Sequence, residues 1–258
     1  MCDLMVIYEI SASVATLTMN DPERRNPLGS ETIEGLIVGL RRALDDPQVS
    51  VVVITGAGDA AFSAGGDLAS GFFEDPVARH SERGRFADLL RLLWSGGKPT
   101  VARVNGHALA GGFGLAVACD ITLCVDDAKL GVPEVRVGLW PMMITAALAR
   151  AMPQKAALEL MLTGRTITPH EALRLGAVSR VVSRSGLDAA VEETVASLRN
   201  APSSVMIGRD AFMSVASTDS DTALDRLQGG LTAVASTRDA REGVSAFVEK
   251  RPPSFGQQ

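Results

Sequence analysis

The stretch that decides the fold is VNGHALAGGFGLAVACDI, which runs from Val104 to Ile121. It is apolar enough for a buried strand followed by a buried helix, yet four glycines interrupt it, at Gly106, Gly111, Gly112 and Gly114. A glycine inside a helix or strand is destabilising by roughly 0.5–1 kcal/mol relative to alanine. The chain must therefore gain something from bare backbone here, either close packing or access to a ligand.

A second glycine-bearing turn lies in VVVITGAGDAAFSAGGDL, residues 51–68. Both turns follow predicted strands, and the turn in 104–121 also opens a predicted helix, whose first N–H groups have no partner within the helix. Such main-chain donors suit an anion. The alternative is that the glycines only permit tight turns and close helix–strand packing.

Outward from these turns, strands and helices alternate through the first half of the chain, which predicts an α/β core with parallel strand pairing. Strands are predicted at 13–20, 51–55, 99–104 and 120–125, and helices at 30–44 and around residues 86–93. From Met142 onward the sequence predicts helices, apart from a weak strand at 179–183. The last helices are predicted near 186–198, 203–217, 219–236 and 239–249. We expect a core over 1–200 that carries the active site, and a C-terminal helical oligomerisation subdomain over 201–258.

Composition narrows the class of protein. The 258 residues are 46% hydrophobic, and the net charge of −5 comes from interspersed signs without a basic block, so we expect no nucleic-acid partner. Three cysteines without a C-x-x-C pair indicate a reducing, cytoplasmic setting. We find no signal-peptide pattern and no apolar run long enough to span a membrane.

Familiar nucleotide and catalytic motifs fit poorly. GAGDAA, residues 56–61, matches a dinucleotide-binding fingerprint, but a second glycine turn follows where a helix should begin. An NAD-binding protein is therefore only a further alternative. GHALAGG, residues 106–112, lacks the Lys-Ser/Thr of a P-loop, and the three histidines show no metal-ligand spacing, so we expect no metal.

Four stretches, taken in order, resemble the signature regions of the crotonase, or enoyl-CoA hydratase/isomerase, superfamily. They are FSAGGDL (62–68), VNGHALAGGFGLAVACDI (104–121), GVPEVRVGLWP (131–141) and LTGRTITPHEALRLGAVSRVV (162–182). The resemblance implies a spiral of ββα units, a homotrimer or a dimer of trimers, and an acyl-CoA substrate of the kind found in fatty acid metabolism. It implies no separate cofactor, since coenzyme A is part of the substrate.

The resemblance also assigns chemistry to the two glycine turns. In the family, one backbone N–H from each turn forms an oxyanion hole for the thioester carbonyl, and motif matching places these donors at Ala64 and Gly111. Preorganised donors of this kind stabilise an enolate, and the loss of one lowers the rate by about 10²–10³. The matching acid/base is Glu134, whose valine neighbours predict a raised carboxyl pKa. From the residues alone, Glu134 could equally be solvated in a surface turn.

One position departs from the pattern. Family hydratases carry a second glutamate three residues after the oxyanion-hole glycine, where this chain has Gly114. Double-bond isomerisation with one glutamate therefore stays open, as does hydration by Glu134 alone or with a carboxylate from the 67–80 segment (Asp67, Glu74, Asp75). A decarboxylase or hydrolase, or a non-catalytic CoA-binding homologue, are the alternatives.

The substrate-binding residues are less sharply defined. The resemblance suggests Arg24 and Arg25, just before Leu28, as contacts for the CoA phosphates, and Lys250 as a contact for the nucleotide bound to a neighbouring subunit. Solvated surface charges are the alternative for these three. Leu28 is predicted to bind the substrate, and Leu68, Leu139 and Trp140 are predicted to line the acyl pocket, with ordinary packing as the alternative. Asp67 is expected either near the substrate or as a cap of the helix after SAGG.

Overall fold

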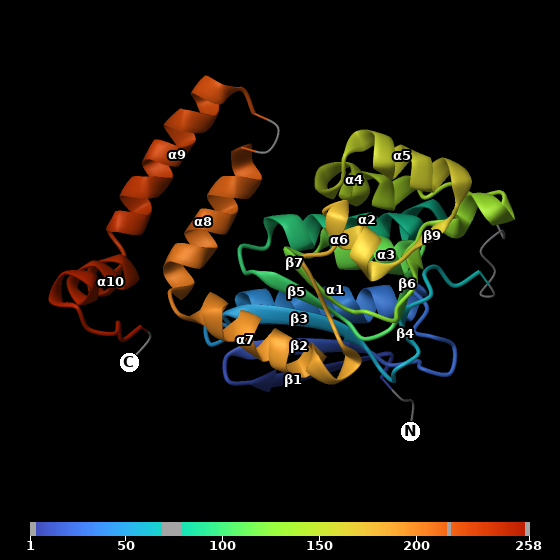
Figure 1. Cartoon of the computed structure of the whole chain (residues 1–258), viewed down its shortest axis with the longest axis horizontal. Coiled ribbons are helices and arrows are strands. Elements are labelled where there is room, and N and C mark those ends of the chain that lie inside the picture. The colour runs from blue at the N-terminus through green and yellow to red at the C-terminus, as the bar shows by residue number, and fades with distance from the viewer. Residues whose placement is uncertain (1–3, 69–78, 216–217, 256–258) are drawn as a thin grey trace.

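Figure 1 shows the computed structural model, which describes residues 4–68, 79–215 and 218–255 of the 258-residue chain. Its main layer is a six-stranded sheet in the order β1-β2-β3-β5-β7-β10. The strands are β1 (Val6–Ser11), β2 (Val14–Met19), β3 (Val51–Gly56), β5 (Thr100–Val104), β7 (Ile121–Val125) and β10 (Arg180–Val182). β1 and β2 form an antiparallel hairpin, and every pair from β2 to β10 is parallel.

A second, smaller sheet stands beside the first and carries the two glycine turns. It contains β4 (Ala61–Ser63), β6 (His107–Leu109), β8 (Leu130–Gly131) and β9 (Thr166–Ile167). β4, β6 and β8 are parallel to one another, while β9 is antiparallel to β8. The carboxyl ends of β4, β6 and β8 therefore meet at one edge.

Helices cover both sheets. They are α1 (Ser30–Asp45), α2 (Arg79–Ser95), α3 (Gly111–Ala118), α4 (Met142–Ala151), α5 (Gln154–Thr163), α6 (Pro169–Arg174) and α7 (Leu187–Arg199), with two 3₁₀ turns, η1 (Pro133–Val137) and η2 (Arg184–Gly186). α1 packs on β1 and β2, and α7 packs across β3, β5 and β7. All six residues of β3 are buried, as expected for a central parallel strand with covered faces.

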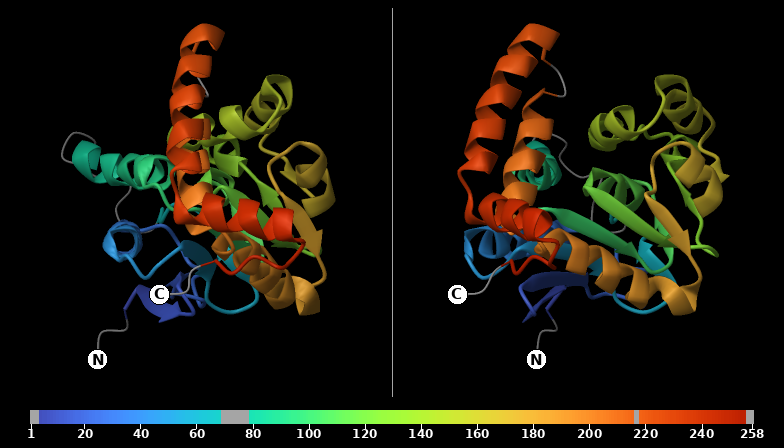
Figure 2. Two further views of the ribbon diagram at one scale, coloured as in Figure 1. Left: turned by 90° about the vertical axis from the view of Figure 1, so that its left-hand side faces the viewer. Right: turned by 60° about the vertical axis from the view of Figure 1, so that its left-hand side comes forward.

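The C-terminal helices α8 (Pro202–Val215), α9 (Ser220–Ala235) and α10 (Arg238–Glu249) extend away from the sheets (Figures 1 and 2). α8 is tied to the core by the buried Arg209, whose Nε donates to Asp120 Oδ2 at 2.7 Å. The same guanidinium donates to the carbonyl of Leu93 in α2. Large apolar side chains on these helices stay exposed, among them Leu231 at 70% and Phe247 at 84%.

The longer predicted elements are confirmed, including the parallel pairing and the four C-terminal helices. β1 and the short strands of the second sheet were not predicted. The fingerprint hypothesis at 56–61 is wrong about local structure, because β4 follows this glycine turn where a dinucleotide site needs a helix.

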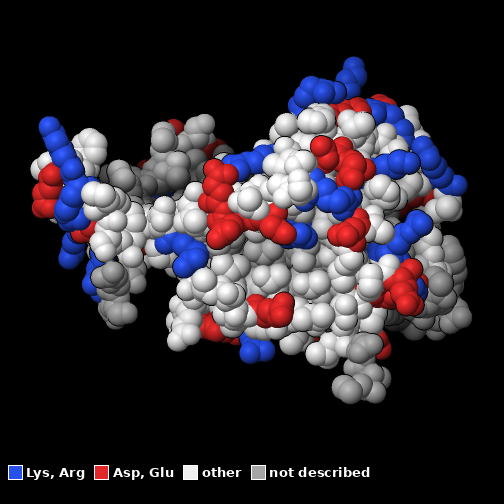
Figure 3. Space-filling model, turned by 60° about the horizontal axis from the view of Figure 1, so that its bottom comes forward, with Lys and Arg blue, Asp and Glu red and all other residues white. Residues whose placement is uncertain are grey.

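The described residues contain no helix that is both long enough and apolar enough to cross a membrane. On the face shown in Figure 3, positive and negative side chains are interspersed.

The exposed apolar side chains of α8–α10 generate a prediction about assembly. Light scattering should give a trimer or a hexamer, because burying this apolar surface between copies is favourable at about 25 cal/mol per Å². Leu231→Glu should lower the assembled mass, whereas Gln228→Glu, on the same exposed helix, should not. A monodisperse wild-type monomer would contradict this prediction.

Candidate active site

The two glycine turns touch each other at the carboxyl ends of β4 and β6. A Cβ added at Gly65, whose φ is 93°, would lie 2.6 Å from Ala110 Cβ and 3.1 Å from the Gly111 nitrogen. A Cβ added at Gly112 would lie 2.5 Å from the Ser63 carbonyl oxygen. Real Cβ atoms do not approach other atoms so closely, so bare backbone is required for this contact. The glycines therefore bring two main-chain segments together. This close packing accounts for glycine at positions where it destabilises a helix or strand.

Hydrogen bonding changes the assignment of the first oxyanion donor. The Ala64 N–H donates to the Arg25 carbonyl at 2.9 Å, and the Gly65 N–H donates to Ser63 Oγ at 3.2 Å. The Gly66 N–H has no acceptor among the described residues, and a Cβ added at Gly111 would lie 3.8 Å from this nitrogen. The prediction for Ala64 is therefore wrong for this geometry, since its N–H is engaged; Gly66 supplies the available donor.

The N–H of Gly111, predicted as the second donor, lies at the start of a helix. Gly111 is the first residue of α3, so its N–H has no partner within the helix and lies at the positive end of the helix dipole. Ala110 precedes it with φ 51°, a conformation that costs a non-glycine residue on the order of 1–3 kcal/mol. Two hydrogen bonds hold it there: its N–H donates to the Gly131 carbonyl, and its carbonyl accepts from the Gly114 N–H.

Glu134 follows β8, the strand next to β6, and so comes from the same edge of the small sheet. Pro133 opens the short η1 turn, and the Leu139 N–H folds back to the Glu134 carbonyl at 3.0 Å. Its Oε2 atom is buried without a hydrogen-bond partner among the described residues. Burial raises the pKa of Glu134, and an interaction with its own backbone N–H offsets part of that rise. A solvated surface glutamate is therefore excluded.

The space at Gly114 is filled by an apolar side chain from α4. A Cβ added at Gly114 would lie 2.0 Å from Ile144 Cγ2 and 2.3 Å from Ile144 Cβ. Ile144 is itself buried, with 3% of its surface exposed. No larger side chain fits at position 114 unless Ile144 moves, so the site is built around one carboxylate on this side.

The predicted apolar substrate-binding residues differ in burial and position. Leu28 is buried, and its Cδ1 atom would lie 3.3 Å from a Cβ at Gly111, which places it beside the second donor. Leu139 and Trp140 are half-buried in the segment after Glu134, whereas Leu68 is 46% exposed. Leu28 is thus brought to the glycine turns, while Leu139 is held to the η1 turn by its hydrogen bond to the Glu134 carbonyl.

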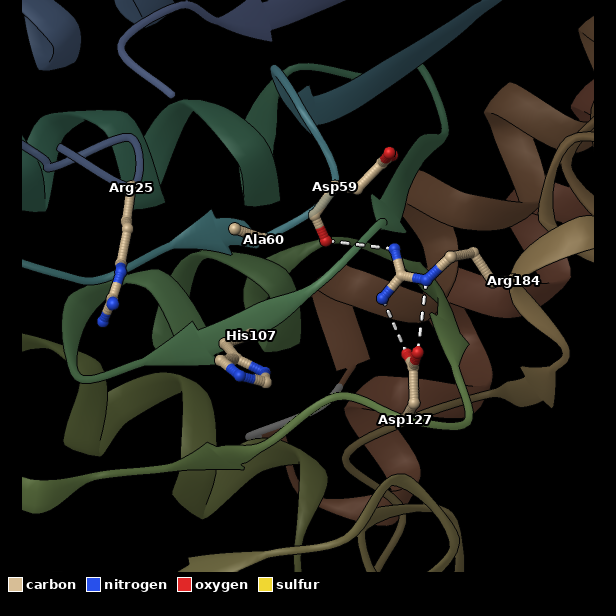
Figure 4. Close-up of a pocket in the computed structure, with 6 residues that line it drawn as sticks. All are labelled: Arg25, Asp59, Ala60, His107, Asp127 and Arg184. Atoms are coloured by element: carbon tan, nitrogen blue, oxygen red, sulfur yellow. Dashed lines mark hydrogen bonds and ion pairs between the residues drawn. The ribbon is translucent and has the colours of Figure 1, made fainter. Parts of the chain in front are cut away.

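The charged residues that were predicted to bind the substrate lie at different places in the structure. Arg24 Nη2 donates to Asp67 Oδ2 at 2.6 Å, while Arg25 lines a cavity with His107 (Figure 4). Whether Asp67 caps a helix after SAGG is not tested, because residues 69–78, including Glu74 and Asp75, lie outside the described part. Lys250 is exposed at the end of α10, which lies across the molecule from β4 and β6 (Figures 1 and 2). A contact from Lys250 to a neighbouring subunit's ligand stays a prediction.

The sequence reasoning did not single out Gly66, whose N–H has no acceptor among the described residues, or Ile144, which fills the space at Gly114. Gly66 lay within the quoted FSAGGDL motif, but only the hydrogen bond of Ala64 distinguishes the donors. Ile144 lies on another helix, and the sequence offers no signal of its contact with Gly114. Across 4–68, 79–215 and 218–255, no three His, Cys, Asp or Glu side chains gather as metal ligands would.

Comparison with known proteins identifies the family of this chain. The sequence profile described as enoyl-CoA hydratase/isomerase matches residues 9–258. The (E)-benzylidenesuccinyl-CoA hydratase of Thauera aromatica is 36% identical in an alignment 268 positions long, which covers 97% of this chain and 98% of that protein. The short-chain-enoyl-CoA hydratase of Clostridium acetobutylicum is 34% identical over 253 residues, 95% of each chain. The crystal structure of an enoyl-CoA hydratase from Mycobacterium smegmatis superposes with a TM-score of 0.93 at 30% identity, covering 97% of this chain and 98% of the other. The predicted resemblance and the predicted crotonase-like fold are confirmed.

The burial of Glu134 predicts a pH-dependent effect on stability. Its folded-state pKa is raised, so the native state binds more protons than the unfolded state between the two pKa values, and the free energy of unfolding falls as pH rises through that window. Glu134→Gln removes the buried charge and should raise the melting temperature at pH 8 but not at pH 4. Glu192→Gln, the same exchange at an exposed position, should raise it at neither pH. An equal effect of Glu134→Gln at both pH values would contradict the buried-charge explanation.

Proposed function

Because the chain belongs to the enoyl-CoA hydratase/isomerase family, we propose that it transforms an enoyl-CoA thioester through an enolate, with Glu134 as its single acid/base. The observation that supports this most directly is the meeting of two glycine turns that present the Gly66 and Gly111 N–H groups, next to strand β8, which is followed by Glu134 with its buried, unpartnered Oε2.

The two N–H groups are proposed to bind the thioester oxygen. Negative charge develops on that oxygen when a proton leaves C2, and donors that are already in place stabilise it without reorganisation. Gly111 adds the positive end of the α3 dipole. Since both donors belong to the main chain, the absence of side chains leaves the carbonyl free to approach them.

Glu134 is proposed to carry the proton. Its carboxylate removes a proton from C2 of a 3-enoyl-CoA, the double bond shifts to C2–C3 as the enolate collapses, and the same carboxyl returns the proton to C4. Burial raises the pKa of Glu134, which brings a carboxyl closer to the range in which it both accepts and donates a proton at neutral pH. Its unpartnered Oε2 has no competing hydrogen bond among the described residues.

Ile144 favours isomerisation over hydration with two carboxylates. It fills the space at Gly114 with apolar atoms, so neither a second carboxylate nor a water held by one is accommodated there. Hydration by Glu134 alone is the second candidate, and the hydratase names of the relatives from Thauera aromatica and Clostridium acetobutylicum favour it. A non-catalytic homologue would have no need of a buried, partnerless glutamate.

Glu134→Gln should lower turnover by about 10²–10⁴ and leave KM nearly unchanged, because it removes the proton carrier but no substrate contact. Both 3-enoyl-CoA isomerisation and 2-enoyl-CoA hydration should be followed, and in the wild type we expect isomerisation to be faster. kcat/KM should rise with pH through the raised pKa of Glu134, since the base must be ionised. Glu192→Gln is the matched control. Near-normal turnover in folded Glu134→Gln would remove Glu134 from the mechanism, and faster hydration would select the second candidate.

The oxyanion donor can be tested at Gly66 with a matched pair of variants. A Cβ at Gly66 would meet no described atom within 4 Å, so Gly66→Ala keeps the N–H and should retain most of the activity. Gly66→Pro deletes the N–H and should lower turnover by about 10²–10³. Each variant must first show a native melting profile. Equal activities of the two folded variants would show that this N–H does not bind the oxyanion.

A further inference from the structure

The α5–β9 turn, which consists of Gly164 and Arg165, lies against the chain on both sides of Glu134. A Cβ added at Gly164, whose φ is 62°, would lie 2.7 Å from Val135 Cγ1. A Cβ added at Gly131 would lie 2.8 Å from the Arg165 carbonyl oxygen. Because both distances are too short for a real Cβ atom, the turn packs closely against Gly131, which precedes Glu134, and against Val135, which follows it.

The contact at Gly131 also reaches the second glycine turn. The Gly131 carbonyl accepts the Ala110 N–H at 2.9 Å, and the next residue is Gly111, the proposed oxyanion donor. β9 pairs with β8 at this point, with Thr166 opposite Gly131. The α5–β9 turn therefore contacts the stretch of chain that positions both groups of the proposed reaction, the Glu134 carboxyl and the Gly111 N–H.

The Arg165 side chain ties this turn to the helices on either side of it. Its Nε donates to Glu159 Oε1 at 2.8 Å, and its Nη2 donates to Oε2 of the same carboxylate at 3.0 Å, so the guanidinium holds α5 through two bonds. Nη2 also donates to Glu171 Oε1 in α6 at 2.7 Å. An isolated ion pair at this exposure contributes little to stability, whereas a bidentate arginine shared by two carboxylates holds a defined geometry.

Charge does not account for an effect of Arg165 on Glu134. The hydrogen bond from Arg165 lowers the pKa of Glu159, so this carboxylate stays ionised at neutral pH and the network stays formed. The pKa of Glu134 is raised by burial, and its own backbone N–H opposes that rise. Arg165 is therefore expected to act on the position of Glu134 and not on its protonation.

From these contacts we propose that Arg165 is a positioning residue: it holds the α5–β9 turn between α5 and α6, and the turn in turn fixes η1 and Gly131. The catalytic part of this inference rests on the proposed function, because Glu134 must meet the substrate at a fixed distance from the Gly111 N–H. A displacement of about 1 Å between reacting groups lowers a rate by about 10². Arg165 acts on the reaction only through Glu134 and Gly111.

Amide hydrogen exchange tests the hold on η1 without any substrate. The Gly138 and Leu139 N–H groups donate to carbonyls of η1, so their exchange reports on this turn. Arg165→Met should speed exchange in a peptide covering 133–141 by about fivefold or more. Arg180→Met, at an arginine of similar exposure in β10, should leave this peptide unchanged. Unchanged exchange of the peptide in folded Arg165→Met overturns the inference.

Kinetics test the consequence for the reaction, with whichever of 3-enoyl-CoA and 2-enoyl-CoA the wild type turns over faster. Arg165→Met should lower kcat about tenfold and leave KM nearly unchanged, because the base is displaced and no substrate contact is lost. The pH dependence of kcat/KM should stay that of the wild type. Arg180→Met should match the wild type throughout. An unchanged kcat in Arg165→Met, or a pH profile that shifts in place of a lower kcat, overturns the positioning role.

A second variant covers a failure of Arg165→Met to fold. Glu159→Gln removes the carboxylate that binds the guanidinium twice and leaves Arg165 bound to Glu171, so it should change exchange and kcat in the same directions. Unchanged exchange there overturns the inference equally. The two measurements also separate this inference from the proposed function: a wild type that turns over neither substrate refutes the proposed function, and the exchange result alone then decides whether Arg165 holds η1.

Discussion

The structure depends on the close approach of two main-chain segments, Ser63–Gly66 and Ala110–Gly112. At these turns a side chain is excluded on steric grounds, since added Cβ atoms would lie 2.5–2.6 Å from atoms of the facing segment. The contact aligns β4 with β6, and β6 in turn aligns β8, so three strand ends converge at one edge. The stability that the glycines cost locally is offset by the buried elements on either side, such as α3, where seven of the eight residues are buried.

The close approach of the two segments also decides which groups at that edge come from the main chain and which come from side chains. Main-chain N–H groups can be presented without side chains, whereas a proton carrier must be a side chain, and the proposed carrier, Glu134, follows the third strand end. Its burial is unfavourable for the ionised form, because a buried charge loses hydration that no partner replaces. Ile144 contributes to the same dry environment by closing the space at Gly114. The burial of Glu134 therefore lowers the stability of the fold when the carboxyl is ionised, and the same burial raises its pKa.

The length of each helix or strand decided whether the sequence could predict it. The periodic elements of five or more residues, such as β3 and α1, were predicted nearly to their ends because burial patterns repeat along them. β4, β6 and β8 have two or three residues each, too few for any period to appear. Gly111 and Glu134 were placed by motif resemblance. Ala64 was chosen over Gly66 because the hydrogen bond to Arg25 comes from a loop that only the fold brings over β4. The contact between Ile144 and Gly114 is likewise a long-range packing fact.

That loop connects the two ends of the small sheet. Asn26 is buried, its Nδ2 donates to the carbonyls of Ala57 and Ala61, and its Oδ1 accepts the Asp21 N–H, so the loop is fixed beside β4. Fixed in this way, it directs two successive arginines to different places, Arg24 to Asp67 beyond the carboxyl end of β4 and Arg25 to the cavity that His107 also lines, at the amino end. Adjacent residues with the same charge thus serve different environments, because the positive φ at Arg25 and Asn26 turns the chain between them. The family resemblance suggested the CoA phosphates as a common ligand of the two arginines, whereas the structure pairs Arg24 with Asp67 and places Arg25 in the lining of a separate cavity.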